Sequence, residues 1–197
     1  MFSVQQAFAF HGIEAIITAD KKIIESADAI VLPGVGAFGE AMNNLNSTGL
    51  TETIKEFVTK GKPFLGICLG MQLLFESSDE FGSTVGLGII KGKIKKFQFA
   101  DKKVHVPQMA WNNIIEPVKG RWKNTVLEGI ANNEFMYFVH SFYSEPENTD
   151  DVLCLTNYEG FEYCSAVNKA NVTATQFHPE KSADEGLKIY KNWIEKI

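Results

Sequence analysis

A cysteine stands between two glycines in an otherwise apolar stretch of the chain. The stretch PFLGICLGMQLLF spans residues 63–75, and Gly66 and Gly70 lie two positions to either side of Cys68. We expect a strand up to Cys68 and a helix after it, with the thiol at a sharp corner that glycine neighbours permit. The helix N-terminus favours a thiolate through its free N–H groups and dipole. The spacing indicates a nucleophile; a buried cysteine with closely packed glycines is the alternative.

A thiol nucleophile needs a base, and His178 is the best placed histidine. It follows a strand-like segment and precedes a proline, which biases it toward extended backbone. Because residues i and i+2 of an extended segment point the same way, Glu180 can orient the imidazole and stabilise the imidazolium. We therefore predict a triad in the order Cys68, His178, Glu180. The other histidines are His11, without an evident partner, His105, expected at the surface, and His140, expected in the core or a binding site.

A glycine-rich loop, GVGAFG at 34–39, follows the strand-like segment 28–33. It matches the G-x-G-x-x-G pattern of dinucleotide sites, but the next strand ends in Cys68 and not in the acidic residue that such sites use. We favour a loop that presents backbone N–H groups to a tetrahedral intermediate. The N–H of Leu69, next to the sulfur, would be a second donor.

The whole chain has the composition of an ordinary globular protein. It has 197 residues, 45% of them apolar and 22% charged, and a net charge of -5. This balance gives no reason to expect nucleic acid, and no segment has the length or pattern of a membrane span or signal peptide. Three cysteines without metal-type spacing fit a reducing cytoplasm. We expect one domain over residues 1–197.

Helical and extended patterns alternate over the first 76 residues. A helix ends at Gly12, strands are expected at 13–18, 28–33 and 63–68, and a helical stripe runs from Leu50 to Val58. This rhythm predicts an α/β fold with a mainly parallel sheet and helices on both faces.

The second half of the chain is richer in strands. The candidates are 91–97, 135–143, 152–158, 161–167 and 171–177, and they add antiparallel strands to the sheet. Cys154 and Cys164 fall in two of them and are expected in the core. A final helix is predicted to begin with a capping box at Ser182–Glu185. Its expected core-facing residues are Leu187, Tyr190, Trp193, Ile194 and Ile197.

Four segments together resemble the class I, triad-type glutamine amidotransferases. They are PGVGAFGEAM, GKPFLGICLGMQLLFESS, FMYFVHSFY and TQFHPEKS, in the order that the family has them. Within the family, GVGAFG, VPQMAWNN (106–113) and FVHSFY resemble glutaminase subunits that serve imidazole glycerol phosphate synthesis in histidine biosynthesis. The resemblance implies a flavodoxin-like fold.

The resemblance also implies residue roles. Cys68 attacks the side-chain amide carbon of glutamine to form a thioester, and His178, oriented by Glu180, protonates the leaving ammonia and then activates water. The implied oxyanion donors are Leu69, Val35 and Gly36, and the residues that hold the amino-acid end of glutamine are Gln72, Ser141 and Phe142. No metal or organic cofactor is implied, because thiol, imidazole and backbone dipoles cover the chemistry.

Ammonia released into neutral water would be protonated and lost as a nucleophile, so a synthase partner is implied. In the resembled enzymes this partner is a (β/α)₈-barrel cyclase, and Trp111 and Asn112 are the expected contacts. For Trp111, a place in the core is the alternative. The family usually has His and Gly where this chain has Gln108 and Ala110. A related glutaminase that feeds another synthase, for example in surface-sugar biosynthesis, is therefore a second hypothesis.

Two further hypotheses come from other classes: a catalytically silent scaffold that binds a synthase, and a cysteine peptidase or amidase. The intact triad argues against the first, and the match of Gln72 and the Ser-Phe segment to a free amino-acid site argues against the second. The family's first strand would precede Phe2, where this sequence has only Met1. We therefore expect a truncated start and a sheet that lacks an internal strand or has an apolar gap.

Overall fold

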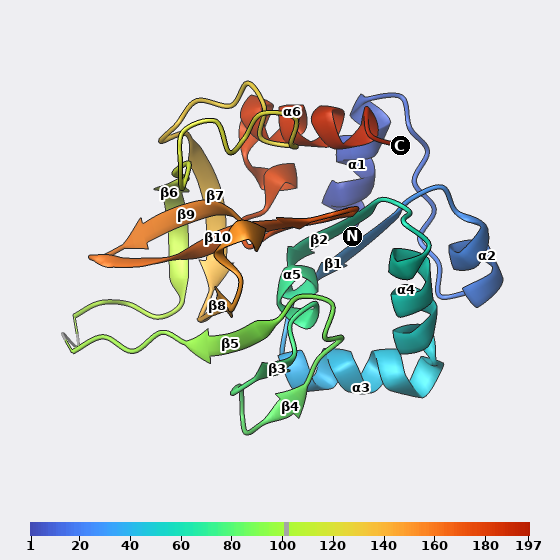
Figure 1. The fold of residues 1–197 in the computed structure, drawn as a ribbon, viewed down its shortest axis with the longest axis horizontal. Coiled ribbons are helices and arrows are strands. Elements are labelled where there is room, and N and C mark those ends of the chain that lie inside the picture. Colours follow the sequence, from blue (N-terminus) through green and yellow to red (C-terminus); the bar gives the residue numbers. More distant parts are fainter. Residues whose placement is uncertain (101–102) are drawn as a thin grey trace.

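A nine-stranded mixed sheet runs through the molecule, in a computed structural model that describes residues 1–100 and 103–197 (Figure 1). Its strand order is β1-β2-β11-β10-β8-β5-β3-β4, and β9 pairs with β10. The strands are β1 (Ile30–Gly34), β2 (Phe64–Cys68), β3 (Ser77–Ser78), β4 (Thr84–Val85), β5 (Gly92–Lys96), β8 (Phe142–Pro146), β9 (Val152–Tyr158), β10 (Phe161–Lys169) and β11 (Val172–Thr175). A separate antiparallel pair consists of β6 (Gln108–Asn113) and β7 (Phe135–His140).

The sheet has a parallel part and an antiparallel part. In the parallel part β2 lies between β1 and β11, and all five of its residues are buried. The second half of the chain adds β8, β9 and β10 in antiparallel pairing. The predicted α/β class, with added antiparallel strands from the second half, is confirmed. Because Cys68 is the last residue of β2, the thiol lies at the carboxyl edge of the parallel strands, where α/β proteins bind ligands.

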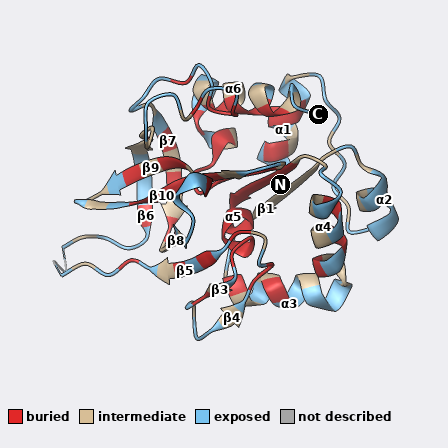
Figure 2. Ribbon diagram, viewed as in Figure 1, coloured by how far each residue is buried: buried red, intermediate tan, exposed pale blue. Residues whose placement is uncertain are grey.

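Helices cover both faces of the sheet (Figures 1 and 2). They are α1 (Phe2–Phe10), α2 (Lys21–Ser26), α3 (Phe38–Thr48), α4 (Leu50–Thr59), α5 (Leu69–Leu73) and α6 (Ala183–Ile194), with short 3₁₀ turns η1 (Thr149–Asp151) and η2 (Pro179–Lys181). One buried cluster joins α1 and α6 to Leu65 and Ile67 of β2. The other joins α3, α4 and α5 to Phe64 of β2. Alternate side chains of β2 thus enter two separate cores.

The predicted strand at 13–18 is wrong. Residues 13–20 have no regular structure, and Ile16 and Ile17 are 71% and 54% exposed. An extended segment needs a neighbouring strand to pair its backbone groups, and β1 ends the sheet with no further strand beside it among the described residues.

The predicted capping box at the start of α6 is also wrong. The Ser182 side chain makes no cap hydrogen bond to its own helix. Its hydroxyl donates instead to the His178 carbonyl (2.7 Å) and accepts from the Tyr137 N–H (3.0 Å). Tyr190 and Trp193 of α6 are buried as predicted, whereas Ile197 lies beyond the helix and is 54% exposed. Ser182 therefore ties the His178 segment to β7.

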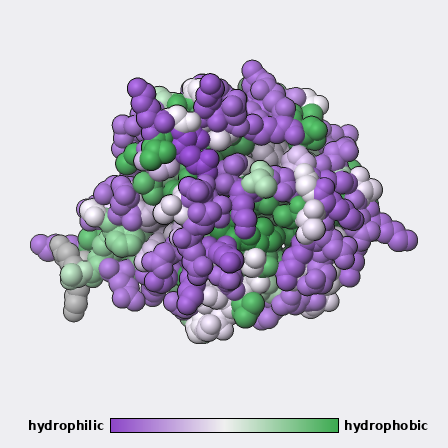
Figure 3. Space-filling model, viewed as in Figure 1, coloured by the Kyte–Doolittle hydropathy of each residue, from purple (hydrophilic) through white to green (hydrophobic). Residues whose placement is uncertain are grey.

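The face of the molecule in Figure 3 is largely hydrophilic, with apolar side chains in scattered groups. Among the described residues, none of the helices combines the length and apolar character needed to span a membrane.

Candidate active site

Cys68 has an unusual backbone conformation at the junction of β2 and α5. Its φ and ψ are 54° and -111°, in a region that costs a residue with a side chain about 1–2 kcal/mol. The expected corner between strand and helix is confirmed. Cys68 is 6% exposed and belongs to the buried cluster that also contains residues of α1 and α6.

The two glycines beside Cys68 allow this corner to form. A Cβ atom on Gly70 would lie 1.7 Å from the carbonyl oxygen of Leu32, inside any permitted contact. A Cβ atom on Gly66 would lie 2.9 Å from Cβ of Ala174. Both positions therefore require glycine for close approach, as the sequence predicts. The neighbouring strands β1 and β11 contact this strand-to-helix corner, residues 66–70, from two sides, and we call the corner the elbow.

His178 and Glu180 form a buried pair directly after β11. His178 Nδ1 lies 2.8 Å from Glu180 Oε1, and the two side chains are 4% and 6% exposed. The His178 N–H donates to the Tyr137 carbonyl (2.9 Å), which fixes the segment against β7. Since Glu180 accepts from Nδ1–H, Nε2 remains for proton transfer, and it has no hydrogen-bond partner among the described residues.

The environment of His178 favours its protonated form. Burial lowers the pKa of the imidazole, but the nearby Cys68 and the hydrogen-bonded Glu180 raise it, to about 9. Gln176, two residues before His178, lies 3.7 Å from Cys68 Sγ through its Nε2, which brings the His178 segment to the thiol. At neutral pH the site thus holds a cation that can give a proton to a leaving group.

Two residues of α6 support this pair: Gly186, which the sequence analysis did not name, and Tyr190, which it expected only as a core residue. A Cβ atom on Gly186 would lie 2.0 Å from the Pro179 carbonyl oxygen, so a larger residue would push α6 away from the turn. Tyr190 is buried, and burial followed by the charge of Glu180 raises the pKa of its phenol. A glycine and a tyrosine inside a helix carry no local signal of such roles, because their partners come from another element.

The glycine-rich loop lies next to the elbow. Gly34 is the register partner of Cys68 between β1 and β2, and a Cβ atom on Gly34 would lie 3.1 Å from Cβ of Leu69. Gly36 has a φ of 103°, and Val35 is 80% exposed. The structure thus brings the predicted oxyanion donors, Leu69, Val35 and Gly36, into one neighbourhood.

A carboxylate that the sequence analysis missed holds the end of this loop. Glu80 Oε2 accepts a hydrogen bond from the N–H of Phe38, the first residue of α3, at 2.6 Å. The negative charge suits the helix N-terminus. This contact fixes the point where the loop enters α3.

Gln72 is held by hydrogen bonds beside the thiol. Its Nε2 donates to the carbonyl oxygen of Phe142 (3.2 Å) and to Oε1 of Gln176 (3.0 Å), and Gln176 Nε2 lies 3.7 Å from Cys68 Sγ. Gln176 is completely buried and was missed by sequence analysis. Ser141, between β7 and β8, accepts from the Phe97 N–H through its carbonyl. The predicted substrate-binding residues Gln72, Ser141 and Phe142 thus meet at the elbow.

Trp111 and Asn112 lie on β6, next to the site. Trp111 is 49% exposed, so the alternative of a core aromatic is wrong. Its ring packs edge-on against Tyr137 (centroids 6.2 Å apart), and Tyr137 in turn lies 6.4 Å from the His178 ring. Asn112 donates from Nδ2 to the Asn157 carbonyl at 2.9 Å. The exposed part of β6 is therefore one aromatic ring away from the His178 imidazole.

The remaining histidines and cysteines lie outside the Cys68–His178 pair and differ in their exposure and contacts. His105 is exposed and His140 is buried, while His11 contacts the Leu187 carbonyl through Nε2 (2.8 Å). Cys154 and Cys164 are buried as predicted, and burial raises the pKa of each thiol to about 12. No group of side chains in the described part of the chain could hold a metal ion. Among the three thiols, Cys68 alone has a base beside it.

The chain is similar in sequence to known glutamine amidotransferases over nearly its whole length. The family described as glutamine amidotransferase class-I matches residues 8–197. The chain is 46% identical over 193 residues to the imidazole glycerol phosphate synthase subunit HisH of Sulfurimonas denitrificans, covering 97% of this chain and 90% of that protein. It is 43% identical to the subunit HisH of Chlorobium chlorochromatii, covering 98% and 93% of the two chains.

Solved structures share the fold at lower identity. A glutamine amidotransferase crystal structure has a TM-score of 0.74 and 18% identity, covering 98% of this chain and 92% of that one. The structure of PurLQS from Thermotoga maritima has a TM-score of 0.73 and 17% identity, with coverages of 99% and 92%. At such identities the similarity concerns the fold alone.

Proposed function

Because the chain belongs to the class-I glutamine amidotransferase family, we propose that it hydrolyses L-glutamine to glutamate and ammonia as the glutaminase subunit of an imidazole glycerol phosphate synthase. The observation that carries this proposal is the strained elbow at Cys68 with the buried His178–Glu180 pair within electrostatic reach. The relatives that carry the name of this synthase subunit match the chain over nearly its whole length. The pathway is then histidine biosynthesis, and the expected compartment is the cytoplasm.

The proposed reaction begins at the thiol. Cys68 gives its proton to His178, and the resulting thiolate attacks the side-chain amide carbon of glutamine; the oxyanion that forms accepts hydrogen bonds from the N–H of Leu69 and an N–H of the loop at Val35 and Gly36. The protonated His178 gives its proton to the leaving nitrogen, so ammonia departs and a thioester remains. His178 then takes a proton from water, which attacks the thioester, releases glutamate and restores the thiol.

The amino-acid end of the substrate is proposed to bind at Gln72, Ser141 and Phe142. Both amide hydrogens of Gln72 already have acceptors, so its Oε1, for which no hydrogen bond occurs among the described residues, is left to accept from the α-ammonium group. The backbone of Ser141 and Phe142 lies beside it. No metal or organic cofactor takes part in this proposal, because the thiol, the imidazole and backbone N–H groups cover each step.

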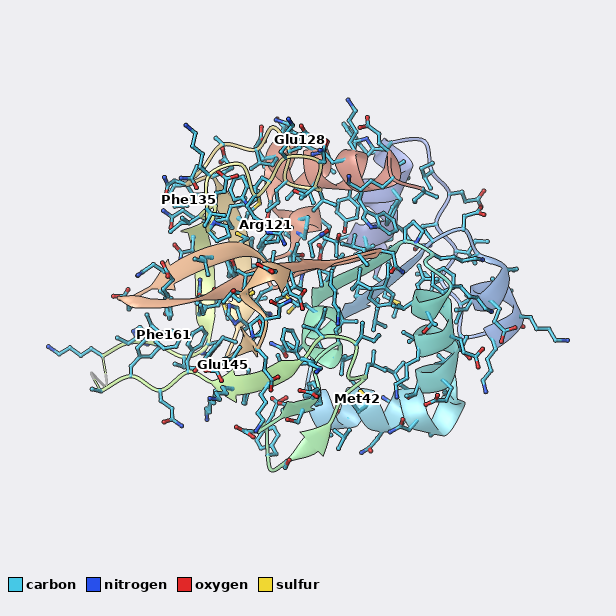
Figure 4. All side chains as sticks on the ribbon, in the orientation of Figure 1. Met42, Arg121, Glu128, Phe135, Glu145 and Phe161 are labelled. Carbon is cyan, nitrogen blue, oxygen red and sulfur yellow. The ribbon has the colours of Figure 1, made fainter. Side chains whose placement is uncertain are left out.

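The proposed partner is a (β/α)₈-barrel cyclase that receives ammonia without release into water. The exposed Met109 and Trp111 of β6, with Phe135 at the start of β7, form an apolar surface that is 63%, 49% and 55% exposed at these residues (Figure 4 labels Phe135). Asn112 supplies a polar group in the same strand. A docked partner at this surface would lie next to Tyr137 and His178, where ammonia forms.

The test measures glutamate formation by the chain alone and with the cyclase subunit of the same organism and its substrate. We expect weak activity alone and a rise of about 10²–10³-fold in the complex, the value of one correctly aimed oxyanion donor. The exposed glycine loop at Val35 and Gly36 motivates this coupling. The matched control is the Cys68→Ala chain in the same complex. Equal glutamate formation by this variant, or none by the parent chain under any condition, would overturn the proposal.

A further inference from the structure

A row of buried polar side chains leads from β6 toward the glutamine site. Gln108, the first residue of β6, is completely buried, and its Oε1 lies 2.9 Å from the hydroxyl of Tyr163 on β10. The same hydroxyl lies 3.1 Å from Nε2 of His140, the last residue of β7. His140 Nδ1 in turn lies 2.7 Å from the carbonyl oxygen of Phe142. Three strands thus contribute one side chain each to a continuous polar path.

The hydrogen bonds of this path have a fixed direction. A carbonyl oxygen only accepts, so Nδ1 of His140 carries the hydrogen that points to Phe142. Burial lowers the pKa of His140 to about 4, which leaves its Nε2 without a proton at neutral pH. Nε2 must therefore accept from the Tyr163 hydroxyl.

This direction also defines the orientation of the Gln108 amide. The single hydroxyl proton of Tyr163 cannot go to both His140 Nε2 and Gln108 Oε1, and Gln108 Nε2 has no partner among the described residues. With the amide turned end for end, its NH₂ group donates to the phenol oxygen and the phenol proton is free for His140. The path then runs Gln108 to Tyr163 to His140 to the Phe142 carbonyl.

The path continues to the catalytic thiol. The Phe142 carbonyl also accepts from Gln72, which donates to Gln176, and Gln176 points its Nε2 at Cys68 Sγ. The rings of Phe97 and Phe138 lie 5.3 and 5.8 Å from the His140 ring. These rings exclude water from the middle of the path, which strengthens its hydrogen bonds.

We propose that Gln108, Tyr163 and His140 form a positioning relay that holds the Phe142 carbonyl and, through it, the amide of Gln72 in the geometry that binds glutamine. The inference rests on the proposed function and adds three residues to it, none of which reaches the reacting atoms. Without the relay the Phe142 carbonyl loses one of its two donors, and the Gln72 amide loses a fixed acceptor. Affinity for the amino-acid end of glutamine should then fall while the reactivity of Cys68 stays the same.

The test uses a glutamine-analogue chloroketone, which must bind as glutamine does before it alkylates Cys68. The half-saturation concentration and the maximal alkylation rate are measured for the parent chain and for Tyr163→Phe. We expect the half-saturation concentration to rise about tenfold, as for one lost buried hydrogen bond, with an unchanged maximal rate. Alkylation of Cys68 by iodoacetamide, which needs no glutamine site, should also be unchanged.

Two controls separate the relay from general destabilisation. Tyr158→Phe removes a tyrosine hydroxyl that bonds the His105 carbonyl outside the relay, and it should leave the half-saturation concentration unchanged. His140→Asn keeps an N–H near the position of Nδ1 and should bind the analogue better than His140→Gln, which places its amide near Nε2. A merely structural role would not distinguish these two replacements.

Different outcomes would overturn the relay and the proposed glutaminase function. An unchanged half-saturation concentration in Tyr163→Phe, or equal values for His140→Asn and His140→Gln, would overturn the relay while leaving the glutaminase intact. Should Tyr163→Phe fail to fold, the His140 pair decides alone. Failure of the analogue to label Cys68 in the parent chain would instead overturn the proposed function.

Discussion

At the elbow, backbone sterics hold the Cys68 thiol in place: Gly70 has no room for a side chain, and Cys68 keeps a positive φ. At the relay, side-chain hydrogen bonds between strands hold a carbonyl: Gln108, Tyr163 and His140 come from β6, β10 and β7. The elbow is continuous in sequence and the relay is assembled from distant segments. Both end at the same small site.

This difference predicts two kinds of response to mutation. Repulsion between atoms rises steeply, so an added methyl group at the elbow should have a large effect that is close to all-or-none. A hydrogen bond contributes about 0.5–1.5 kcal/mol, so its loss from the relay should give a graded effect on binding.

Replacing the thiol at the elbow should have the largest effect on activity. Cys68→Ala should lower the rate of glutamine hydrolysis by about 10⁶-fold, as expected for a triad nucleophile. Cys154→Ala and Cys164→Ala should keep their turnover per folded molecule, because both thiols are buried and lack a base. Initial rates and mass spectrometry after glutamine-analogue labelling provide the measurement. A label on Cys154 or Cys164 would contradict the role of the elbow.

His178 and Glu180 should act together. Glu180→Gln should cost about 10⁴-fold in rate, less than His178→Ala, and the double variant should be no worse than His178→Ala. Effects that multiply in the double variant would show independent roles.

The raised pKa of His178 also predicts how stability depends on pH. The folded pKa is about 9 and the ordinary value is 6.5, so protonation stabilises the folded state. The contribution is complete below pH 6.5, declines from there to about 9, and is absent above. Urea unfolding of the parent chain and His178→Gln should therefore show a stability difference that shrinks over this range. NMR titration should find a lower His178 pKa in Cys68→Ala; an unchanged value would show that the thiol does not act on this imidazole.

Adding one methyl group at Gly70 should destabilise the elbow strongly. Gly70→Ala places Cβ against the Leu32 carbonyl oxygen and should lower the free energy of unfolding by more than about 4 kcal/mol. Gly61→Ala is the matched control, because Gly61 also lies in a turn and has no atom near its missing Cβ. Alanine at this position must adopt the positive φ of Gly61, which should lower the free energy of unfolding by about 1 kcal/mol. Similar urea midpoints for the two variants would remove the steric argument.

A substitution on the exposed part of β6 should weaken binding of the cyclase and leave the stability of the chain almost unchanged. Trp111→Ala should weaken association with the cyclase by about 2 kcal/mol, as for an interface hot spot, and change the free energy of unfolding by about 0.5 kcal/mol or less. Calorimetric titration and urea unfolding measure the two quantities. Unchanged affinity would place the partner elsewhere on the molecule.

The smallest predicted effect concerns backbone strain at the elbow. Both Cys68→Ala and Cys68→Gly remove the thiol, but glycine adopts a φ of 54° without strain. We expect Cys68→Gly to be about 1 kcal/mol more stable than Cys68→Ala, as measured by urea unfolding. Equal stability would show that the surrounding packing, and not Cys68 itself, carries the strain.

The sequence alone determined the features that depend on near neighbours. Glycine spacing predicts the corner at Cys68 because steric limits act over two residues. The pairing of His178 with Glu180 was also predicted, but the i, i+2 geometry of extended backbone is not its cause, because Glu180 lies in the 3₁₀ turn η2. The helices α1, α4 and α6 and the strand β2 were likewise predictable from apolar periodicity and stop signals.

The tertiary structure decided whatever depends on a distant partner. Residues 13–18 have a strand-like pattern but no strand beside them, and Ser182 has the pattern of a cap but bonds Tyr137 and His178 instead. Gln176 and Tyr163 carry no sequence signal, because a buried amide or phenol gains its role from whichever acceptor the fold brings near. Hydrogen bonds act over about 3 Å in space and are indifferent to separation along the chain. The relay therefore became visible only once β6, β7 and β10 were in place.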